Sequence, residues 1–184
     1  QSSIRNKTFS LKEFEIDSIE DRAFDAANYL ESLDFSLNNL KIIKPRIFLR
    51  LSNLKLLNLS NNLIETLESS HFTHLKNLQK LILSFNPITK IEENAFNNLE
   101  FLNELSLISC NIKVFNKNWF KNLKNIFRID FTDNQIEKLE NGTFIELKNS
   151  VILNFDKNRI KFIEIEVLMN MIRLDTLNLD LNYI

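Results

Sequence analysis

The sequence predicts an α/β solenoid, in which short parallel strands stack from one coil to the next. Three observations predict it: apolar residues that return every 24 positions, an asparagine that recurs in register with them, and very little glycine and proline. A chain of 184 residues, 44% of them hydrophobic, is long enough to bury a sizeable core. With one glycine and two prolines, Gly and Pro turns must be rare, so other residues have to turn the chain.

The repeat is clear in residues 54–77, which read LKLLNLSNNLIETLESSHFTHLKN. The alternating apolar positions near the start of each unit predict a short strand with one buried face. A strand of about three residues is not stable alone, so stacked units must pair their strands into one long parallel sheet. We expect a single domain over residues 1–184, with a truncated last unit and with units that start near Asn6, Leu30, Leu54, Leu78, Leu102, Ile126, Ser150 and Leu174.

The ninth position of the units follows the strand and predicts a buried turn. It carries Asn38, Asn62, Asn86, Cys110, Asn134, Asn158 and Asn182. An asparagine amide has donors and acceptors, and a buried group left unpaired would cost about 1–3 kcal/mol. We therefore expect a ladder of buried side chains. Cys110, the only cysteine, is predicted to be a buried substitute in this ladder rather than a nucleophile, a disulfide partner or a metal ligand.

The nineteenth position predicts the convex side of the core. It carries Phe24, Phe48, Phe72, Phe96, Phe120, Phe144 and, in the last complete unit, Leu168. These side chains should pack along the solenoid. We expect Trp119, one position earlier, to be an oversized residue at the edge of this core. His71 and His74 are expected to be surface histidines, because no further metal ligands lie near them in the pattern.

The registered Leu, Asn and Phe positions resemble the leucine-rich-repeat family, in particular its 24-residue "typical" class. Members similar in pattern include the ectodomains of Toll and Toll-like receptors and secreted immune proteins of invertebrates. The resemblance covers residues 9–184 and implies a curved horseshoe, with the strands on the concave face and loops or short helical turns on the convex face. It also implies a binding module without enzymatic activity or a cofactor.

The ends of the sequence differ from the extracellular members of this family. Neither QSSIRNKTFS nor LDTLNLDLNYI contains the cysteine-rich cap that such members usually carry. Because a terminal repeat without a polar cap exposes apolar edges, we expect the chain to be a fragment of a longer protein. No apolar run approaches the roughly 20 residues that cross a bilayer, so we expect no membrane insertion within this segment. The sequence makes no prediction about the oligomeric state.

Two patches are predicted on the concave face. The first is apolar and consists of Ile82, Phe85 and Ile108, which suits a protein partner. The second is acidic, lies further along the chain and consists of Asp130, Asp133, Asp156, Asp175 and Asp180, with Arg128 and Lys157 interspersed. It favours a basic partner. A structural reading stays open for both: Phe85 can simply pack on its neighbours, and the acidic face can be solvated and compensated by nearby cations.

Catalysis and metal binding are not predicted. Asp156 and Asp180 fall in adjacent strands and could share a proton or a calcium ion. However, the face offers no histidine and no glycine-rich loop to complete an active site. The formal net charge of -1 and the lack of basic runs give no reason to expect nucleic acid as a partner.

The localisation is predicted mainly from the repeat class. Candidate N-glycosylation sites occur at Asn6, Asn58 and Asn141, and they permit secretion without proving it. A glycan at Asn58 would obstruct the concave face. Our leading hypothesis is a recognition module of an extracellular glycoprotein, either a receptor ectodomain or a secreted protein of innate immunity or adhesion, which binds a protein on its concave face. The alternative is a cytoplasmic scaffold or regulator of an enzyme.

Overall fold

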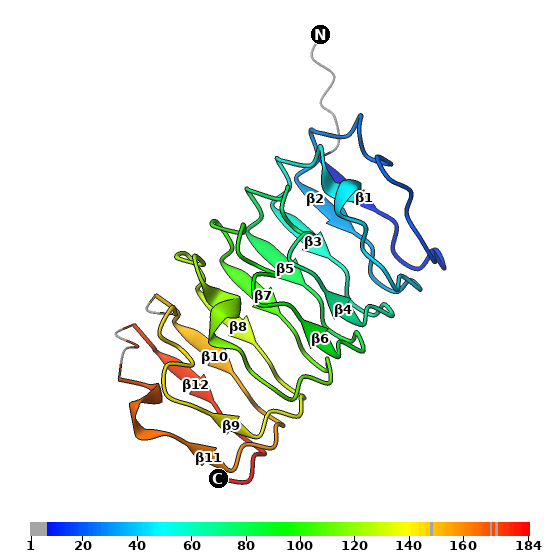
Figure 1. Ribbon diagram of the computed structural model, residues 1–184. Helices are drawn as coiled ribbons and strands as arrows, with labels where there is room; N and C mark the ends of the chain where they lie inside the picture. The colour runs from blue at the N-terminus through cyan, green and yellow to red at the C-terminus, as the bar shows by residue number, and fades with distance from the viewer. Residues whose placement is uncertain (1–6, 148, 170, 172) are drawn as a thin grey trace.

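The computed structural model describes residues 7–147, 149–169, 171 and 173–184. Over these residues the chain is a stack of coils that all run the same way, as Figure 1 shows. Eight short strands in this part form one parallel sheet, in the order β1, β2, β3, β5, β7, β8, β10, β12. Their bounds are Thr8–Ser10, Ser32–Asp34, Leu56–Asn58, Lys80–Ile82, Glu104–Ser106, Arg128–Asp130, Ile152–Asn154 and Thr176–Asn178. The predicted solenoid with parallel strands is confirmed.

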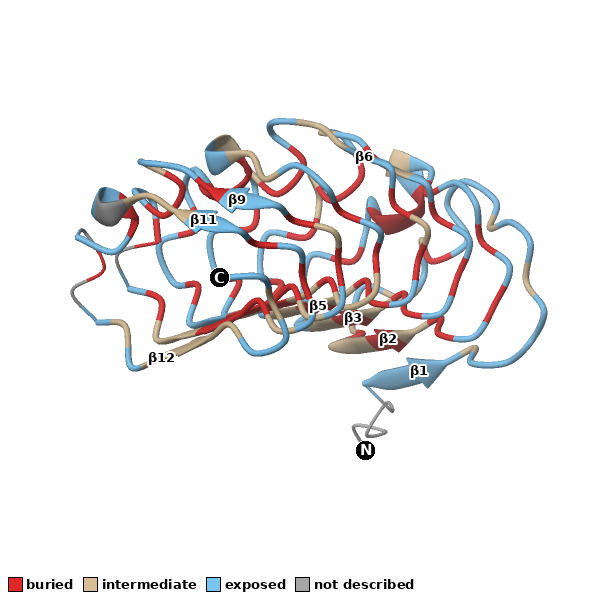
Figure 2. Ribbon diagram, turned by 90° about the horizontal axis from the view of Figure 1, so that it is seen from below, coloured by how far each residue is buried: buried red, intermediate tan, exposed pale blue. Residues whose placement is uncertain are grey.

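The register of the sheet follows the repeat. Leu57 of β3 pairs with Leu33 of β2 and Leu81 of β5, each 24 residues away. The central side chain of most strands points into the core and is fully buried, while its neighbours face outward. Figure 2 shows this sheet along the inner side of a shallow arc. The name coil four denotes residues 78–101, and coil five denotes residues 102–125.

The opposite side of the solenoid carries shorter elements. β4 (Thr66–Leu67) pairs with β6 (Lys90–Ile91), and β9 (Lys138–Leu139) pairs with β11 (Phe162–Ile163), both in parallel. Three short 3-10 helices lie in the described part of the chain, η1 at Pro45–Phe48, η2 at Lys117–Phe120 and η3 at Ile165–Val167. Coil five lies between the two pairs and contributes η2 but no strand to this side.

The asparagine ladder is present. In Asn62, for example, the amide donates to the Phe35 carbonyl of the preceding coil at 2.9 Å and to the Leu59 carbonyl of its own coil at 3.0 Å. Its oxygen accepts from the backbone N–H of Leu40 at 3.0 Å. The six asparagines repeat this pattern, so each one satisfies the backbone groups of two coils at the turn.

The eighth position of each unit, which precedes the ladder position from the second unit on, has a left-handed backbone that the sequence did not indicate. The φ angles lie between 52° and 65° for Glu13, Leu37, Asn61, Phe85, Ser109, Asp133, Lys157 and Leu181. Such a conformation costs roughly 1–2 kcal/mol for most residues with a Cβ atom, and Asn tolerates it best. The turn therefore depends on hydrogen bonds of the ladder, because six of these eight residues are neither Asn nor Asp and have no intrinsic preference for this conformation.

The phenylalanine series is confirmed as core, with one correction. The six Phe residues are buried, and Phe72 and Phe96 stack with ring centroids 6.3 Å apart. Leu168, however, is 40% exposed. η1 and η2 end on the phenylalanine of their coil, whereas η3 ends one residue earlier, at Val167. Leu168 is thus the residue after the helix and turns outward, while Val167 is buried.

The expectation for His71 is wrong. Its ring is buried, because the eighteenth position belongs to the core in this coil, as it does for Ile47 and Ala95 in neighbouring coils. Trp119 at the same position is also buried, and its indole N–H donates to the carbonyl of Ile91 in coil four at 3.3 Å.

Candidate functional site

The concave face has a shallow cavity of about 310 Å³ over β5, β7 and β8. Four of the predicted site residues line it: Ile82, Ile108, Arg128 and Asp130. The Lys80 ammonium lies 2.6 Å from the Glu104 carboxylate at the rim, and the Arg128 guanidinium lies 3.5 Å from the Asp130 carboxylate. The cavity therefore has an apolar wall and a rim in which each cation faces an anion.

Phe85 follows β5 by three residues and bonds to the backbone of Ile108, which lines this cavity. Its backbone N–H donates to the Ile108 carbonyl at 2.8 Å, which places the predicted apolar residues next to one another. The side chain is 51% exposed, although it is the largest apolar side chain in the left-handed turn positions. The apolar patch of Ile82, Phe85 and Ile108 is thus a contiguous surface rather than part of the core.

Asp130 is not a free carboxylate. It is only 8% exposed, and its oxygens accept from the backbone N–H of Thr132 at 3.1 Å and from the amide of Asn154 at 2.9 Å. The amide of Asn178 donates in turn to Asn154 at 2.7 Å. Sequence reasoning missed Asn154 and Asn178, although the fifth position of every unit lines up along the sheet and could have indicated this chain of hydrogen bonds.

The remaining acidic residues do not gather in one pocket. Asp133 accepts from the Ser109 hydroxyl and lines a second cavity of about 420 Å³, together with Lys157 and Arg159. The Asp156 carboxylate accepts from the backbone N–H of Asp180 at 2.8 Å. Asp133 and Asp156 therefore accept hydrogen bonds from different neighbours and do not form one joint anionic site. Within the described part of the chain no three His, Cys, Asp or Glu side chains are placed to hold a metal ion.

The candidate glycosylation sites differ in accessibility. Asn6 lies outside the described residues. Asn58 is half-buried in β3, between Asp34 and Ile82 of the adjacent strands, and its oxygen accepts from the Ser60 hydroxyl at 2.8 Å. Asn141 is exposed on a loop before Gly142, whose φ is 80°. Asn141 therefore has room for a glycan without covering the sheet.

Cys110 shows no sign of a reactive centre. It is fully buried in the asparagine ladder, as predicted, and its Sγ lies 3.4 Å from the carbonyl oxygens of Leu83 and Ile108. Burial raises the pKa of the thiol to about 12. The thiolate form that reacts with electrophiles is therefore strongly disfavoured.

The repeat pattern matches the family model described as Leucine rich repeat over five overlapping stretches, residues 7–64, 29–88, 52–112, 77–136 and 100–160. The chain belongs to the leucine-rich-repeat family. A comparison with curated protein sequences finds no match. Solved structures of Toll-type ectodomains are similar to this leucine-rich-repeat chain, as its sequence pattern suggested.

Two of these structures contain chains that are much longer than this one. A TLR13–ssRNA13 complex contains a receptor chain that is 32% identical, with a TM-score of 0.92 over 96% of this chain and 25% of that one. The complex of Toll with Spatzle in Drosophila has a TM-score of 0.79 at 18% identity, over 96% of this chain and 27% of that one. The leucine-rich-repeat chain thus spans about a quarter of either neighbour. No helix in the described residues has the length and hydrophobicity to cross a bilayer.

Proposed function

We propose that this leucine-rich-repeat chain is a non-enzymatic recognition module that binds a protein partner on its concave face, at the patch of Ile82, Phe85 and Ile108. The exposure of Phe85 carries the proposal. An aromatic ring that is 51% exposed in a left-handed turn does little for the fold, since Asn61 fills the same turn one coil earlier. Aromatic side chains, Phe among them, are enriched in protein–protein interfaces relative to the rest of the surface.

The charges around the patch support a protein partner. Lys80 and Arg128 are paired with Glu104 and Asp130, so the rim presents both signs rather than a basic stripe. Phosphate backbones are bound by unpaired cations, and their release of counterions makes binding strongly dependent on salt. Single-stranded RNA is the second candidate, because the neighbour with 32% identity is a TLR13–ssRNA13 complex.

The setting that we propose is the extracellular side of a receptor, or a secreted protein of innate immunity. The similarity to Toll-type ectodomains supports it, and the exposed Asn141 gives such a protein an accessible glycosylation site. A cytoplasmic scaffold is the alternative. To test glycosylation, the chain is expressed behind a secretion signal and treated with a glycosidase. A shift in gel mobility that is absent in Asn141→Gln would support a glycan at Asn141. A chain that is secreted without any glycan would contradict it.

The binding test compares the wild type with Phe85→Asn, which removes the ring but suits the left-handed turn. Leu181→Asn is the matched control, because Leu181 has the same backbone conformation and is exposed far from the patch. Immobilised chains are incubated with secreted proteins of the source organism, and separately with fluorescein-labelled single-stranded RNA at several salt concentrations. The dissociation constant for any recovered protein should rise at least ~10-fold in Phe85→Asn and stay unchanged in Leu181→Asn.

The outcomes separate the candidates. Asp156→Lys, on the acidic patch, should weaken a basic protein partner if that patch also contributes. A protein bound equally by wild type, Phe85→Asn and Asp156→Lys would show that both patches are wrong. Saturable RNA binding that weakens steeply with salt, without recovery of any protein, would replace the protein partner by RNA.

A further inference from the structure

The hydrogen bonds between coil four and coil five are interrupted on the side opposite the concave sheet. Between coils three and four, the N–H groups of Thr89 and Glu92 donate to the carbonyls of Glu65 and Leu67, both at 2.9 Å. Among the described residues, the corresponding N–H groups of Lys113 and Asn116 make no such bond to coil four. The described segment 113–116 is joined by backbone bonds to neither adjacent coil.

Cys110 accounts for the start of this interruption. At the other turns the ladder asparagine accepts from a backbone N–H 22 residues earlier, as Asn134 does from Ile112 at 3.0 Å. Cysteine has no such oxygen, and the N–H of Ile88 bonds instead to the Asn86 carbonyl at 2.8 Å within its own coil. Asn111 has a left-handed φ of 58° and makes no bond to Ile88, whereas Gln135 bonds to Ile112. The two coils therefore separate here.

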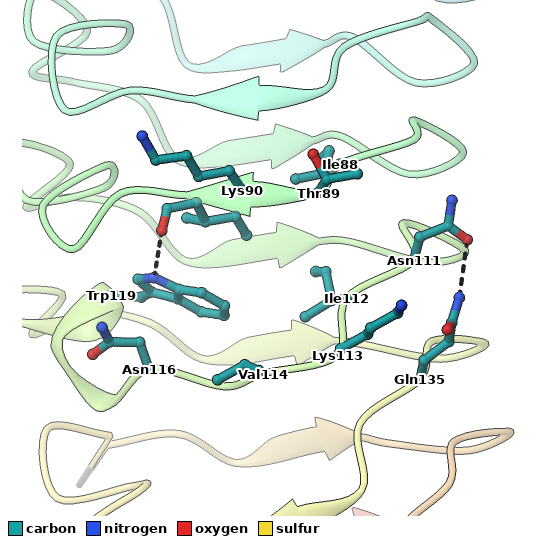
Figure 3. A pocket seen from close by; sticks show the side chains of 11 residues that line it. Ile88, Thr89, Lys90, Asn111, Ile112, Lys113, Val114, Asn116, Trp119 and Gln135 are labelled. Atoms are coloured by element: carbon teal, nitrogen blue, oxygen red, sulfur yellow. Dashed lines mark hydrogen bonds between the residues drawn. The ribbon is translucent and has the colours of Figure 1, made fainter.

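The separation opens a cavity of about 640 Å³, which Figure 3 shows from close by. Ile112, Val114 and Trp119 of coil five face Ile88 and Lys90 of coil four across it. Its volume lies within the range of roughly 300–1,000 Å³ found for small-molecule sites. The Trp119 indole N–H is bonded to Ile91, so its ring is held in place as an apolar wall.

The charges at the mouth of this cavity have one sign. Lys90 and Lys113 line it, and none of its lining residues is Asp or Glu. Lys113 takes part in no ion pair among the described residues, and the Lys90 ammonium is 3.8 Å from the nearest carboxylate, Glu92. The neighbouring cavity on the other side of Val114 carries both signs of charge, because Glu137 and Glu140 line it together with Lys113 and Lys138.

We propose that the cavity between coils four and five binds a small amphipathic anion. Its apolar body lies against Ile112, Val114 and Trp119, and its acidic group faces Lys113. Desolvated apolar contact provides the affinity, and the Lys113 ammonium selects the sign of the head group. The site is distinct from the concave face and does not depend on the protein partner proposed there.

The test uses the fluorescence of Trp119, which is the only tryptophan of the chain and therefore reports on this cavity alone. The purified chain is titrated with dodecanoate below its critical micelle concentration, and in parallel with dodecyltrimethylammonium. Dodecanoate should change the Trp119 emission saturably, with an affinity at least ~10-fold higher than that of the cation. Equal responses to both amphiphiles would overturn the proposal, because they indicate adsorption without a charged site.

Substitutions locate the binding. Lys113→Glu and Val114→Asp should each weaken dodecanoate at least ~10-fold, and both side chains are exposed, so the fold should tolerate them. Lys161→Glu and Phe162→Asp are matched controls, since these exposed residues occupy the same positions two coils later. The controls should bind as the wild type does. A loss as large in the controls, or no loss in Lys113→Glu and Val114→Asp with thermal unfolding unchanged, would show that the cavity is not the site.

Discussion

At the scale of single residues, the surroundings of Cys110 determine its reactivity. The thiol is fully buried, and burial raises its pKa to about 12, so very little thiolate forms near neutral pH. We predict that iodoacetamide labels the folded chain at least ~100-fold more slowly than the chain unfolded in urea. Mass spectrometry can measure both rates, because Cys110 is the only site for the label. Labelling of the folded chain at the unfolded rate would contradict its place in the ladder.

His71 makes stability depend on pH. Burial disfavours the charged imidazole and lowers the pKa of His71, while Glu68 and Glu92 oppose this effect less strongly. The Nδ1 atom accepts from the backbone N–H of Glu68 at 3.2 Å, which requires the form without a proton there. Because the folded pKa is below the unfolded value of 6.5, the unfolded chain binds more protons as the pH falls, and stability is lost below that value.

The resulting prediction concerns the range between pH 7 and pH 5. Carboxylates whose pKa is lowered, such as Glu31 and Glu92, lose their contribution only below their ordinary value of 4.5. The free energy of unfolding, measured in urea, should therefore fall from pH 7 to pH 5 in the wild type. It should fall less in His71→Thr, which has no imidazole to protonate. Threonine is chosen because Thr143 occupies the same position in another coil. His74→Thr is the control. An identical fall in both variants would show that His71 does not titrate with folding.

At the scale of elements, the strands and the asparagine turn were predictable, but the second side of the solenoid was not. Alternating leucines leave one way to bury a short strand, so the sheet follows from the pattern. The separation of coils four and five does not follow from the pattern, because Ile112 and Phe115 keep the apolar spacing of the other units. The one feature of the sequence that indicated the separation was Cys110, which we interpreted as a tolerated substitution. The left-handed turns were also hidden, since Leu37, Phe85 and Lys157 have nothing in common as residue types.

Replacing Cys110 by asparagine, the residue found at the other ladder positions, tests this explanation of coil five. In Cys110→Asn the new amide oxygen can accept from the N–H of Ile88, and its NH₂ group can donate to Leu83, as Asn134 does in the next coil for Ile112 and Leu107. We predict a gain of about 1 kcal/mol in the free energy of unfolding. Urea denaturation followed by circular dichroism measures it. Cys110→Ser is the control and should show no gain, because its hydroxyl is too short to reach both groups. Equal stability of the two variants would show that the absent hydrogen bonds to Ile88 and Leu83 do not weaken this interface.

At the scale of the whole molecule, the repeat brings predicted site residues together only where the coils place them in neighbouring columns. Ile82 and Phe85 of coil four lie next to Ile108 of coil five, because the two coils are adjacent in the sheet. The acidic residues share a sign but not a pocket, because Asp130 faces Asn154 whereas Asp133 lies beside Lys157 and Arg159. Equivalent positions of successive repeats thus predict which residues are neighbours. The side-chain hydrogen bonds that occupy a carboxylate, as Asn154 does for Asp130, are visible only in the structure.

The stack of coils also has a predicted weak point. In a solenoid each coil contacts only its neighbours, so stability is approximately a sum of coil and interface terms. Between coils four and five the sheet bonds remain, such as Leu83 N–H to Ser106 at 2.9 Å, but among the described residues the Asn111 N–H makes no bond to Ile88, and the Ile88 N–H donates within its own coil rather than to the ladder position of coil five. Partial unfolding should therefore divide the molecule at this interface.

Native-state hydrogen exchange in urea below the unfolding transition measures this division. The amides of Phe35 and Leu59 report on the coils before the interface, and those of Phe131 and Phe155 report on the coils after it; all four are bonded within the sheet. Each pair should share one opening free energy, and the two values should differ. In Cys110→Asn the two opening free energies should converge, because the added ladder hydrogen bonds join the coils before the interface to the coils after it. If all four amides of the wild type exchange with a single free energy equal to that of global unfolding, then the interface between coils four and five holds as firmly as the others.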